Sequence, residues 1–241
     1  MPKIKFSSHP DVVKSIPHPR PATKFVPEWY KKMELLIQTK ERVSEKGVAT
    51  VDHPTMKKCM PVRDYLTTGY IIPCWQDILI RKDSEGKYHN QVREAEHLSN
   101  AYAMGVSWHS INQVVGSPFE KFTDGEKLLK FLNPWVIQTP KGYSTYFTAP
   151  FFHEGAVTIL PAIVDTDTHN VQINFPAIIH EDECRIERGT PIIHAIPFKR
   201  ENWDSVVEEL DVDKSNARML NFSSRLQSIY TTKYWQRKRF R

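Results

Sequence analysis

The pattern of apolar and polar positions predicts helices near the two ends of the chain and strands between them. Trp29, Met33, Leu36 and Ile37 recur at helical spacing and predict a helix from Pro27 to about Lys40. A second helical turn is expected after Thr55 and should break at Pro61. Apolar runs predict strands at Trp75–Arg81, Tyr88–Val92, Trp135–Thr139, Tyr143–Thr148, Val157–Val164, Val171–Phe175, Cys184–Glu187 and Pro191–Pro197.

Turn residues separate these strands. Residues 83–86 (Asp-Ser-Glu-Gly) and 140–142 (Pro-Lys-Gly) are typical of tight turns, with Gly142 expected at positive φ. Beyond the last strand, Asn202 is expected to cap a short helix that carries Trp203, Val206, Val207 and Leu210. A final helix from about Ser215 should present Met219, Phe222, Leu226, Ile229 and Tyr230 on one stripe. The fold class is therefore mainly β (α+β), a β-sandwich or a barrel with peripheral helices.

Proline and charge suggest three segments. Five prolines in residues 1–26 predict an extended arm, residues 27–213 a single β-rich domain with short helices, and residues 214–241 a basic helix or tail. The chain has a net charge of +5, with 33 Lys and Arg against 28 Asp and Glu. Eight basic residues and no acidic one lie between Lys214 and Arg241, so the positive charge belongs to the tail.

The tail is a candidate partner-binding segment. Trp235, Arg237, Lys238 and Arg239 combine cations with an aromatic ring, which suits phosphate contacts and base stacking on a nucleic acid. The same residues suit docking on an acidic protein surface. A solvated tail without a partner is the third reading.

The sequence lacks features that are typical of several classes of protein, and this argues against those classes. No apolar run approaches the roughly 20 residues of a membrane span, and the N-terminus has no apolar signal core, so a cytosolic protein without membrane contact is expected. Three cysteines without a CxxC pair are expected to be reduced and at least partly buried. The chain contains no Gly-x-Ser-x-Gly elbow and no glycine-rich phosphate loop.

Ten histidines raise the question of a metal site. The chain has no His-x-His pair. Asp165, Asp167, His169 and His194 could converge if their strands pair, because spacing two places residues on one face of a strand. Surface or hydrogen-bonded histidines are the ordinary alternative, and we expect no bound metal.

Three motifs follow one another in the strand-rich region. They are Pro140-Lys141-Gly142-Tyr143, Val164-Asp165-Thr166-Asp167, and a turn at Gly189 leading into a strand that contains His194. Over about residues 135–199 this order resembles dUTPases and dCTP deaminases, which have a β-clip fold. The resemblance implies a β-clip-like barrel, Asp165 or Asp167 as the catalytic carboxylate, and Tyr143, His169 and His194 as nucleotide-binding positions. It implies Mg²⁺ only for that activity, and no cofactor is expected otherwise.

The sequence also departs from that family. Thr168-His169-Asn170 stands where the family has an aromatic residue and glycine, and no glycine follows Gly189 in the tail. Asp is a common turn residue, so residue type alone predicts that Asp165 and Asp167 cap a turn between strands.

A wider resemblance extends over most of the chain. Its blocks include residues 27–32, 57–61, 69–73, 135–144, 164–167 and 189–200. They resemble a family of proteins found in tailed phages, notably those of marine bacteria, and in some bacteria. The resemblance implies a viral setting, in the host cytoplasm or the virion. The expected function is a non-enzymatic, homo-oligomeric assembly or binding protein; the alternative is a β-clip nucleotide-binding protein or nucleoside triphosphate hydrolase.

Overall fold

The structure is a computed structural model of the whole chain, and it describes every residue except 45–46, 93–104, 123–126 and 224–229. Contacts divide the chain into two compact units. Unit 1 consists of Met1–Phe25 and Gly69–Arg200, and unit 2 of Val26–Thr68 and Glu201–Arg241. These units cut across the predicted arm, domain and tail, since unit 2 joins residues of the predicted domain to the tail.

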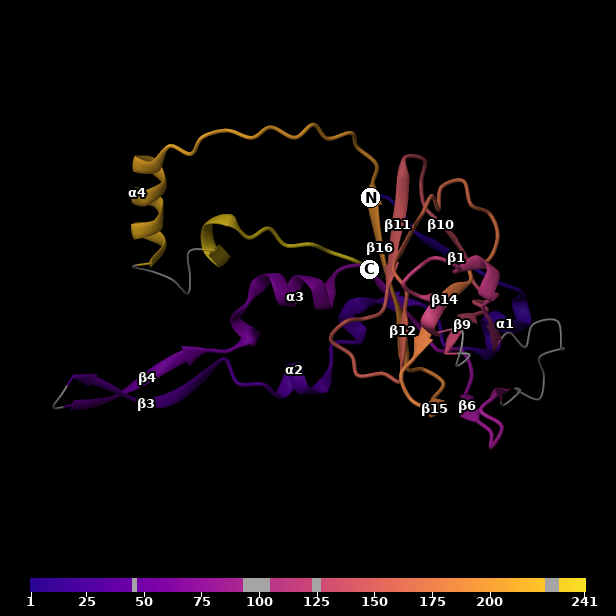
Figure 1. Cartoon of the computed structure of the whole chain (residues 1–241). Coiled ribbons are helices and arrows are strands. Elements are labelled where there is room, and N and C mark those ends of the chain that lie inside the picture. Colours follow the sequence, from indigo (N-terminus) through magenta and orange to yellow (C-terminus); the bar gives the residue numbers. More distant parts are fainter. Residues whose placement is uncertain (45–46, 93–104, 123–126, 224–229) are drawn as a thin grey trace. The chain divides into compact units, whose positions relative to one another are not determined.

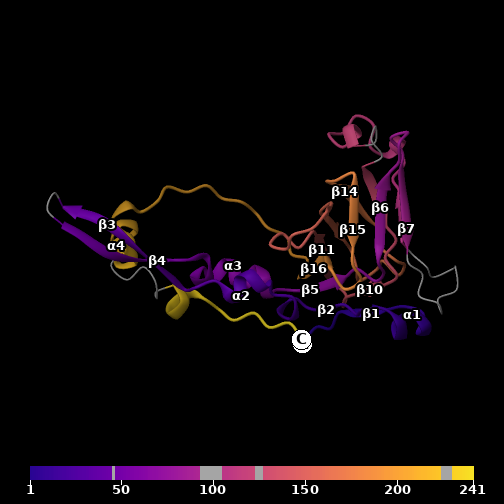
Figure 2. The same ribbon diagram turned by 90° about the horizontal axis from the view of Figure 1, so that it is seen from below.

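Unit 1 is built from antiparallel sheets (Figures 1 and 2). A five-stranded sheet has the order β13 (Ala162–Val164), β11 (Tyr143–Thr148), β16 (Pro191–Lys199), β5 (Tyr70–Pro73) and β2 (Arg20–Pro21). A four-stranded sheet has the order β12 (Val157–Ile159), β14 (Phe175–Ile179), β9 (Leu128–Phe131) and β8 (Val106–Trp108). Smaller sheets pair β15 (Glu183–Ile186), β6 (Ile78–Lys82) and β7 (Tyr88–Val92), and β1 (Lys5–Ser7) with β10 (Val136–Gln138).

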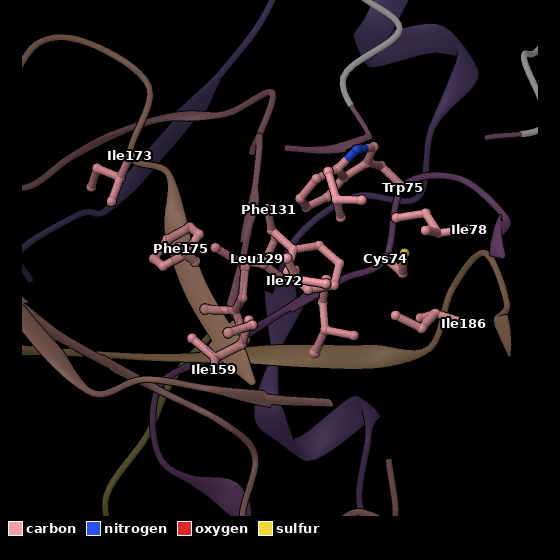
Figure 3. Close-up of a cluster of buried hydrophobic side chains, with 14 of the residues drawn as sticks. Ile72, Cys74, Trp75, Ile78, Leu129, Phe131, Ile159, Ile173, Phe175 and Ile186 are labelled. Atoms are coloured by element: carbon pink, nitrogen blue, oxygen red, sulfur yellow. The ribbon is translucent and has the colours of Figure 1, made fainter. Parts of the chain in front are cut away.

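The core of unit 1 lies where these sheets meet. The ring of Phe147 in β11 is 5.1 Å from that of Phe175 in β14, which joins the two largest sheets. Trp75 and Phe131 form a second, edge-on ring contact at 6.1 Å. Figure 3 shows Ile72, Phe131 and other buried side chains gathered in one interior. Strand residues with inward apolar side chains supply most of this cluster, as expected for sheets with one buried face.

The predicted fold class is confirmed. The chain is mainly β, with several antiparallel sheets and short helices, and the sheet packing is that of a sandwich. The described strands leave the sheets open and close no barrel. The tight turn at 140–142 is also confirmed, since Gly142 has φ of 86°. Among the described residues, no helix is long and apolar enough to cross a membrane.

Short helices complete unit 1. The N-terminal residues form α1 (Pro10–Ser15) and the 3-10 turn η1 (Ala22–Lys24), besides β1 and β2. The prediction of one extended arm is therefore wrong. Pro10 sits in the first turn of α1, where its missing N–H costs nothing, and Val12 and Ile16 reach the core. Two further 3-10 turns, η3 (Ile111–Gln113) and η4 (Glu120–Phe122), follow β8.

Unit 2 contains a β-hairpin and short helices. The hairpin pairs β3 (Leu36–Ser44) with β4 (Gly47–Pro54) (Figure 2). The helices are α2 (Glu28–Lys32), the 3-10 turn η2 (Met56–Lys58), α3 (Met60–Thr67), α4 (Val212–Ser223) and the π-helical turn η5 (Tyr230–Tyr234).

Three helix predictions in unit 2 are wrong. The helix expected to reach Lys40 ends at Lys32, because β3 pairs with a strand rich in β-branched residues such as Val48 and Val51. Pro61 lies in the first turn of α3 and so begins that helix instead of breaking one. No helix forms over 202–210. The predicted final helix is present as α4 up to Ser223, while Leu226 and Ile229 lie outside the described residues.

Three strand predictions need new boundaries. The strand expected from Trp75 begins at Ile78. The run from Val157 to Val164 is two strands in different sheets, interrupted at Pro161, which has no N–H for a ladder. The strand expected from Val171 begins at Phe175, and only an isolated bridge joins Gln172 to Val136.

Candidate functional site

The predicted carboxylates lie in a turn that closes one edge of the five-stranded sheet. Residues 165–169 follow β13, and the backbone N–H groups of Thr168 and His169 both donate to the carbonyl oxygen of Asp165. Asp165 keeps an exposed side chain, whereas only 2% of the Asp167 side chain is exposed. The two acids therefore share a turn but not an environment.

Asp167 is held by two donors from distant parts of the sheet. Its Oδ2 accepts the backbone N–H of Gly142 at 2.8 Å and Nη2 of Arg200 at 2.5 Å. Its Oδ1 accepts Nη1 of Arg200 at 2.9 Å. The guanidinium and carboxylate thus form a two-pronged ion pair that joins the end of β16 to the turn after β13.

These donors change the titration of Asp167. Hydrogen bonding to Arg200, and then to the Gly142 N–H, lowers the pKa of Asp167 to about 2. The same pairing raises the pKa of Arg200. A carboxylate that stays ionised and already accepts three hydrogen bonds is poorly placed to take a proton from water.

Arg200 also connects the turn around Gly142 to Asp165. Its Nη1 lies 3.1 Å from three acceptors: the Tyr143 carbonyl oxygen, Ser144 Oγ and Asp165 Oδ1. Ser144 Oγ itself donates to Asp165 Oδ1 at 2.6 Å. We call Gly142, Ser144, Asp165, Asp167 and Arg200 the Arg200 clasp. Its contacts fasten two turns and a strand end together, which is a structural role.

A row of threonine hydroxyls supports the clasp from inside. Thr166, which is fully buried, lies with its Oγ1 2.7 Å from that of Thr139 and 2.8 Å from that of Thr145. The Thr139 N–H donates to the Thr166 carbonyl oxygen at 3.1 Å. Thr166, between the two acids, therefore fastens the turn to Thr145 in β11 and to Thr139 just after β10.

The structure does not bring the three predicted nucleotide-binding residues together in one place. Tyr143 contributes only its carbonyl oxygen to the clasp, and His169 lies in the same turn as the two acids. His194 is buried in β16, opposite Thr148 and Ile71, and its electrostatic neighbour is His153. The described residues include no group of three His, Cys, Asp or Glu side chains able to hold a metal ion.

A separate pocket of about 410 Å³ lies beside β12 and the start of β16. Its wall includes Pro150, Phe151, His153, Arg185, Thr190 and Ile192. Burial lowers the pKa of His153, and the nearby His194 lowers it further, so the imidazole is neutral at neutral pH. None of the described lining residues is a predicted site residue, so sequence reasoning missed this pocket. The only hint was the aromatic, histidine-containing run at 151–153.

The two buried thiols are poorly placed to react. Cys74 and Cys184 are buried as expected, whereas Cys59 is exposed, which contradicts the expectation that it is at least partly buried, and all three are free. Burial raises the pKa of Cys74 to about 12 and that of Cys184 to about 11. Two of the three cysteines therefore carry almost no thiolate at neutral pH.

The tail residues predicted to bind a partner are anchored within unit 2. Nε1 of Trp235 lies 3.0 Å from both carboxylate oxygens of Asp64 in α3, and Lys238 forms an ion pair with the same carboxylate. Arg237 and Arg239 remain exposed. Trp235 and Lys238 thus place the tail on α3, which leaves the two arginines for a partner.

Sequence reasoning missed Arg200 and Asp64. Arg200 is the first cation after the last core strand, so two acids spaced by one residue could have suggested it as their partner. Asp64 carries no such signal, because its partners lie 171 and 174 residues away. In sequence comparison, no known protein family and no curated protein matches this chain.

Proposed function

We propose that this protein is a non-enzymatic assembly or binding protein that works as a homo-oligomer. The observation that carries this proposal is the exposure of apolar side chains along residues 203–212 of unit 2. Trp203 is 85% exposed and Val207 99%, and Val206, Leu210 and Val212 are also exposed. Figure 1 draws residues 201–211 without helix or strand. We call residues 201–213 the acidic segment, because six of them are Asp or Glu.

Exposure on this scale is costly for a chain without a partner. Burying one Val or Leu side chain is worth about 1.5–3 kcal/mol, so the described conformation leaves several such gains unused. Contiguous exposed apolar side chains typically mark protein–protein contacts. A second copy of the chain is the partner that needs no further component, and closed homo-oligomers are the commonest assemblies.

The Arg200 clasp supports a non-enzymatic role. A hydrolase built on Asp165 or Asp167 needs a carboxylate able to orient water, and Asp167 has both oxygens engaged by Arg200 and Gly142. Of the two predicted nucleotide-binding histidines, His169 lies in the same turn as Asp167, whereas His194 is buried in β16 opposite Thr148. The viral setting, in host cytoplasm or virion, rests on the resemblance of the sequence blocks to tailed-phage proteins and is part of the proposal.

Light scattering after size exclusion tests the self-association. Val207→Asp should lower the mass toward that of the monomer, because a charge at this position resists burial. Val171→Asp is the matched control, since Val171 is also exposed but lies in unit 1. A wild-type protein that is monomeric, or equal masses for all three proteins, would contradict the proposal.

A further inference from the structure

Unit 2 contains two stretches of opposite charge. The acidic segment, residues 201–213, has six Asp and Glu residues and no basic one. Residues 214–241 have eight basic residues and no acidic one. The boundary falls between Asp213 and Lys214, at the start of α4. The chain therefore carries both halves of a complementary pair of charged surfaces.

The basic half has a defined place in the structure. Lys57 Nζ donates to the carbonyl oxygens of Lys31 and Met33, at 2.6 and 2.7 Å, which fastens η2 to the end of α2. Helix α3 begins two residues after η2. The Trp235 and Lys238 contacts with Asp64 then hold the tail on α3.

Cations from three elements lie next to these contacts in the chain. Lys32 lies at the end of α2, Arg63 next to the Asp64 anchor, and Arg237 and Arg239 on either side of Lys238. Burial raises the pKa of Tyr30 in α2, and the Arg63 guanidinium opposes that shift, so Arg63 lies near α2. We call Lys32, Arg63, Arg237 and Arg239 the basic surface.

Two of the acids close to the basic surface are already engaged. Glu28 pairs with Lys31 at 2.5 Å, and Asp64 is taken by Trp235 and Lys238. The four members of the basic surface are exposed and form no ion pair with any residue that the structure describes. The surface therefore has unbalanced positive charge suited to an acidic partner.

The acidic segment has matching unused charge. Asp211 is engaged locally, since it pairs with Lys214 at 2.9 Å and accepts the Lys214 N–H. Asp204, Glu208 and Glu209 are exposed and make no ion pair within the described parts of the chain. They are interleaved with Trp203, Val206, Val207 and Leu210, so one segment offers both charge and apolar area.

We infer that the acidic segment of one copy binds the basic surface of a second copy. This inference rests on the proposed self-association and names the two surfaces that meet. Each copy carries one of each, so the contact joins unlike surfaces and either closes a ring or extends a chain of subunits. Charge sets the pairing and its rate, while the interleaved apolar side chains supply the buried area.

Charge reversal on each surface, followed by mixing, tests the inference on the full-length protein. Variant A is Glu208→Lys with Glu209→Lys, and variant B is Arg63→Glu with Arg237→Glu. Each alone should associate at least tenfold more weakly than the wild type, because like charges then face each other. An equimolar mixture of A and B should regain association, since the reversed surfaces complement one another.

Controls separate this contact from other effects. Glu85→Lys, in an exposed turn of unit 1, should leave the mass unchanged. Circular dichroism spectra of A and B should match the wild type. Failure of the mixture to regain association, or full association by A and B alone, would overturn the inference. If Val207→Asp still dissociates the oligomer in that case, the proposed function stands without it.

A nucleic acid is the other partner that the basic surface could attract. Fluorescence anisotropy with a labelled single-stranded oligonucleotide distinguishes the two. Loss of oligonucleotide binding by variant B, with its oligomeric mass intact, would assign the surface to nucleic acid and overturn the inference. The inference predicts that the wild type keeps its oligomeric mass and does not bind the oligonucleotide.

Discussion

Trp235 donates its indole N–H to both carboxylate oxygens of Asp64, 171 residues earlier in the chain, at 3.0 Å each. Lys238 pairs with the same carboxylate. The side chain of Asp64 is only 16% exposed, so these contacts lie in a partly desolvated position where charge-assisted hydrogen bonds are strong. These contacts anchor the basic tail to α3.

The Trp235→Phe variant tests this anchoring of the tail. Phenylalanine keeps most of the ring but removes the donor, and it leaves Asp64 with Lys238 alone. We expect faster hydrogen exchange in α3 and faster tryptic cleavage after Lys233 and Arg237, because the tail opens more often. Trp203→Phe is the matched control, since Trp203 is exposed and makes no such contact within the described chain. Equal rates of hydrogen exchange and of cleavage in both variants would contradict the anchoring of the tail by Trp235.

The Arg200 clasp predicts a defined loss of stability in acid. The pKa of Asp167 is lowered from 3.8 to about 2 in the folded protein. A lowered folded pKa means that the contribution of Asp167 is complete above about pH 4 and is lost as the pH falls through about 2. The urea midpoint of the wild type should therefore fall over that window.

Asp167→Asn should show a smaller fall over the same pH window, since Asn does not titrate, and a lower midpoint at pH 7. Asp204→Asn serves as the control, because Asp204 is exposed and forms no ion pair with a described residue. An Asp167→Asn protein with the wild-type midpoint at pH 7 and the wild-type acid profile would rule out the clasp as a stabilising contact.

Gly142 provides a prediction about backbone conformation. At φ of 86°, a β-branched residue is strained, although nothing lies within 4 Å of an added Cβ. Gly142→Val should therefore destabilise the fold by about 1–3 kcal/mol through strain alone. Gly155→Val is the comparison, because Gly155 is not in the positive-φ region and meets only an ordinary contact at 3.6 Å. Unfolding free energies that are equal for the two variants would reject this explanation.

Local pattern predicted the central strands of the largest sheet well. Tyr143–Thr148 and Pro191–Lys199 pair with each other over six residues, and both are visible in the sequence as runs rich in apolar and aromatic residues that follow turn residues. The errors fall where partners outside the segment decide the outcome. Residues 36–40 carry a helical stripe but pair with β4, and 202–210 carry an amphipathic stripe but form no helix.

The candidate site was predicted only in part. Two acids between strands indicated a polar turn. The structure confirms that turn and shows that Arg200 is the cation paired with it. The position of Arg200 after the last core strand could have suggested it as a partner, but its contact with Asp167 depends on the pairing of β11 with β16 and of β11 with β13. The contacts of Asp64 depend on where a distant tail docks, which no local pattern encodes.

The nucleotide hydrolase alternative makes an opposite prediction that is simple to check. We expect no protein-dependent release of phosphate or diphosphate from a panel of deoxynucleoside triphosphates with Mg²⁺, because Asp167 is engaged by Arg200 and Gly142. Turnover that disappears in both Asp165→Asn and Asp167→Asn proteins, while both remain folded, would replace the non-enzymatic account with the hydrolase.

Sedimentation velocity of the full-length wild type tests the central claim most directly. At micromolar concentration and about 0.15 M salt, the account predicts a species that is an integral multiple of the 28.1 kDa chain. Raising the salt to about 1 M should shift the population toward smaller species, because screening weakens the contact between the acidic segment and the basic surface. A single 28.1 kDa species at every concentration and salt level would contradict the account.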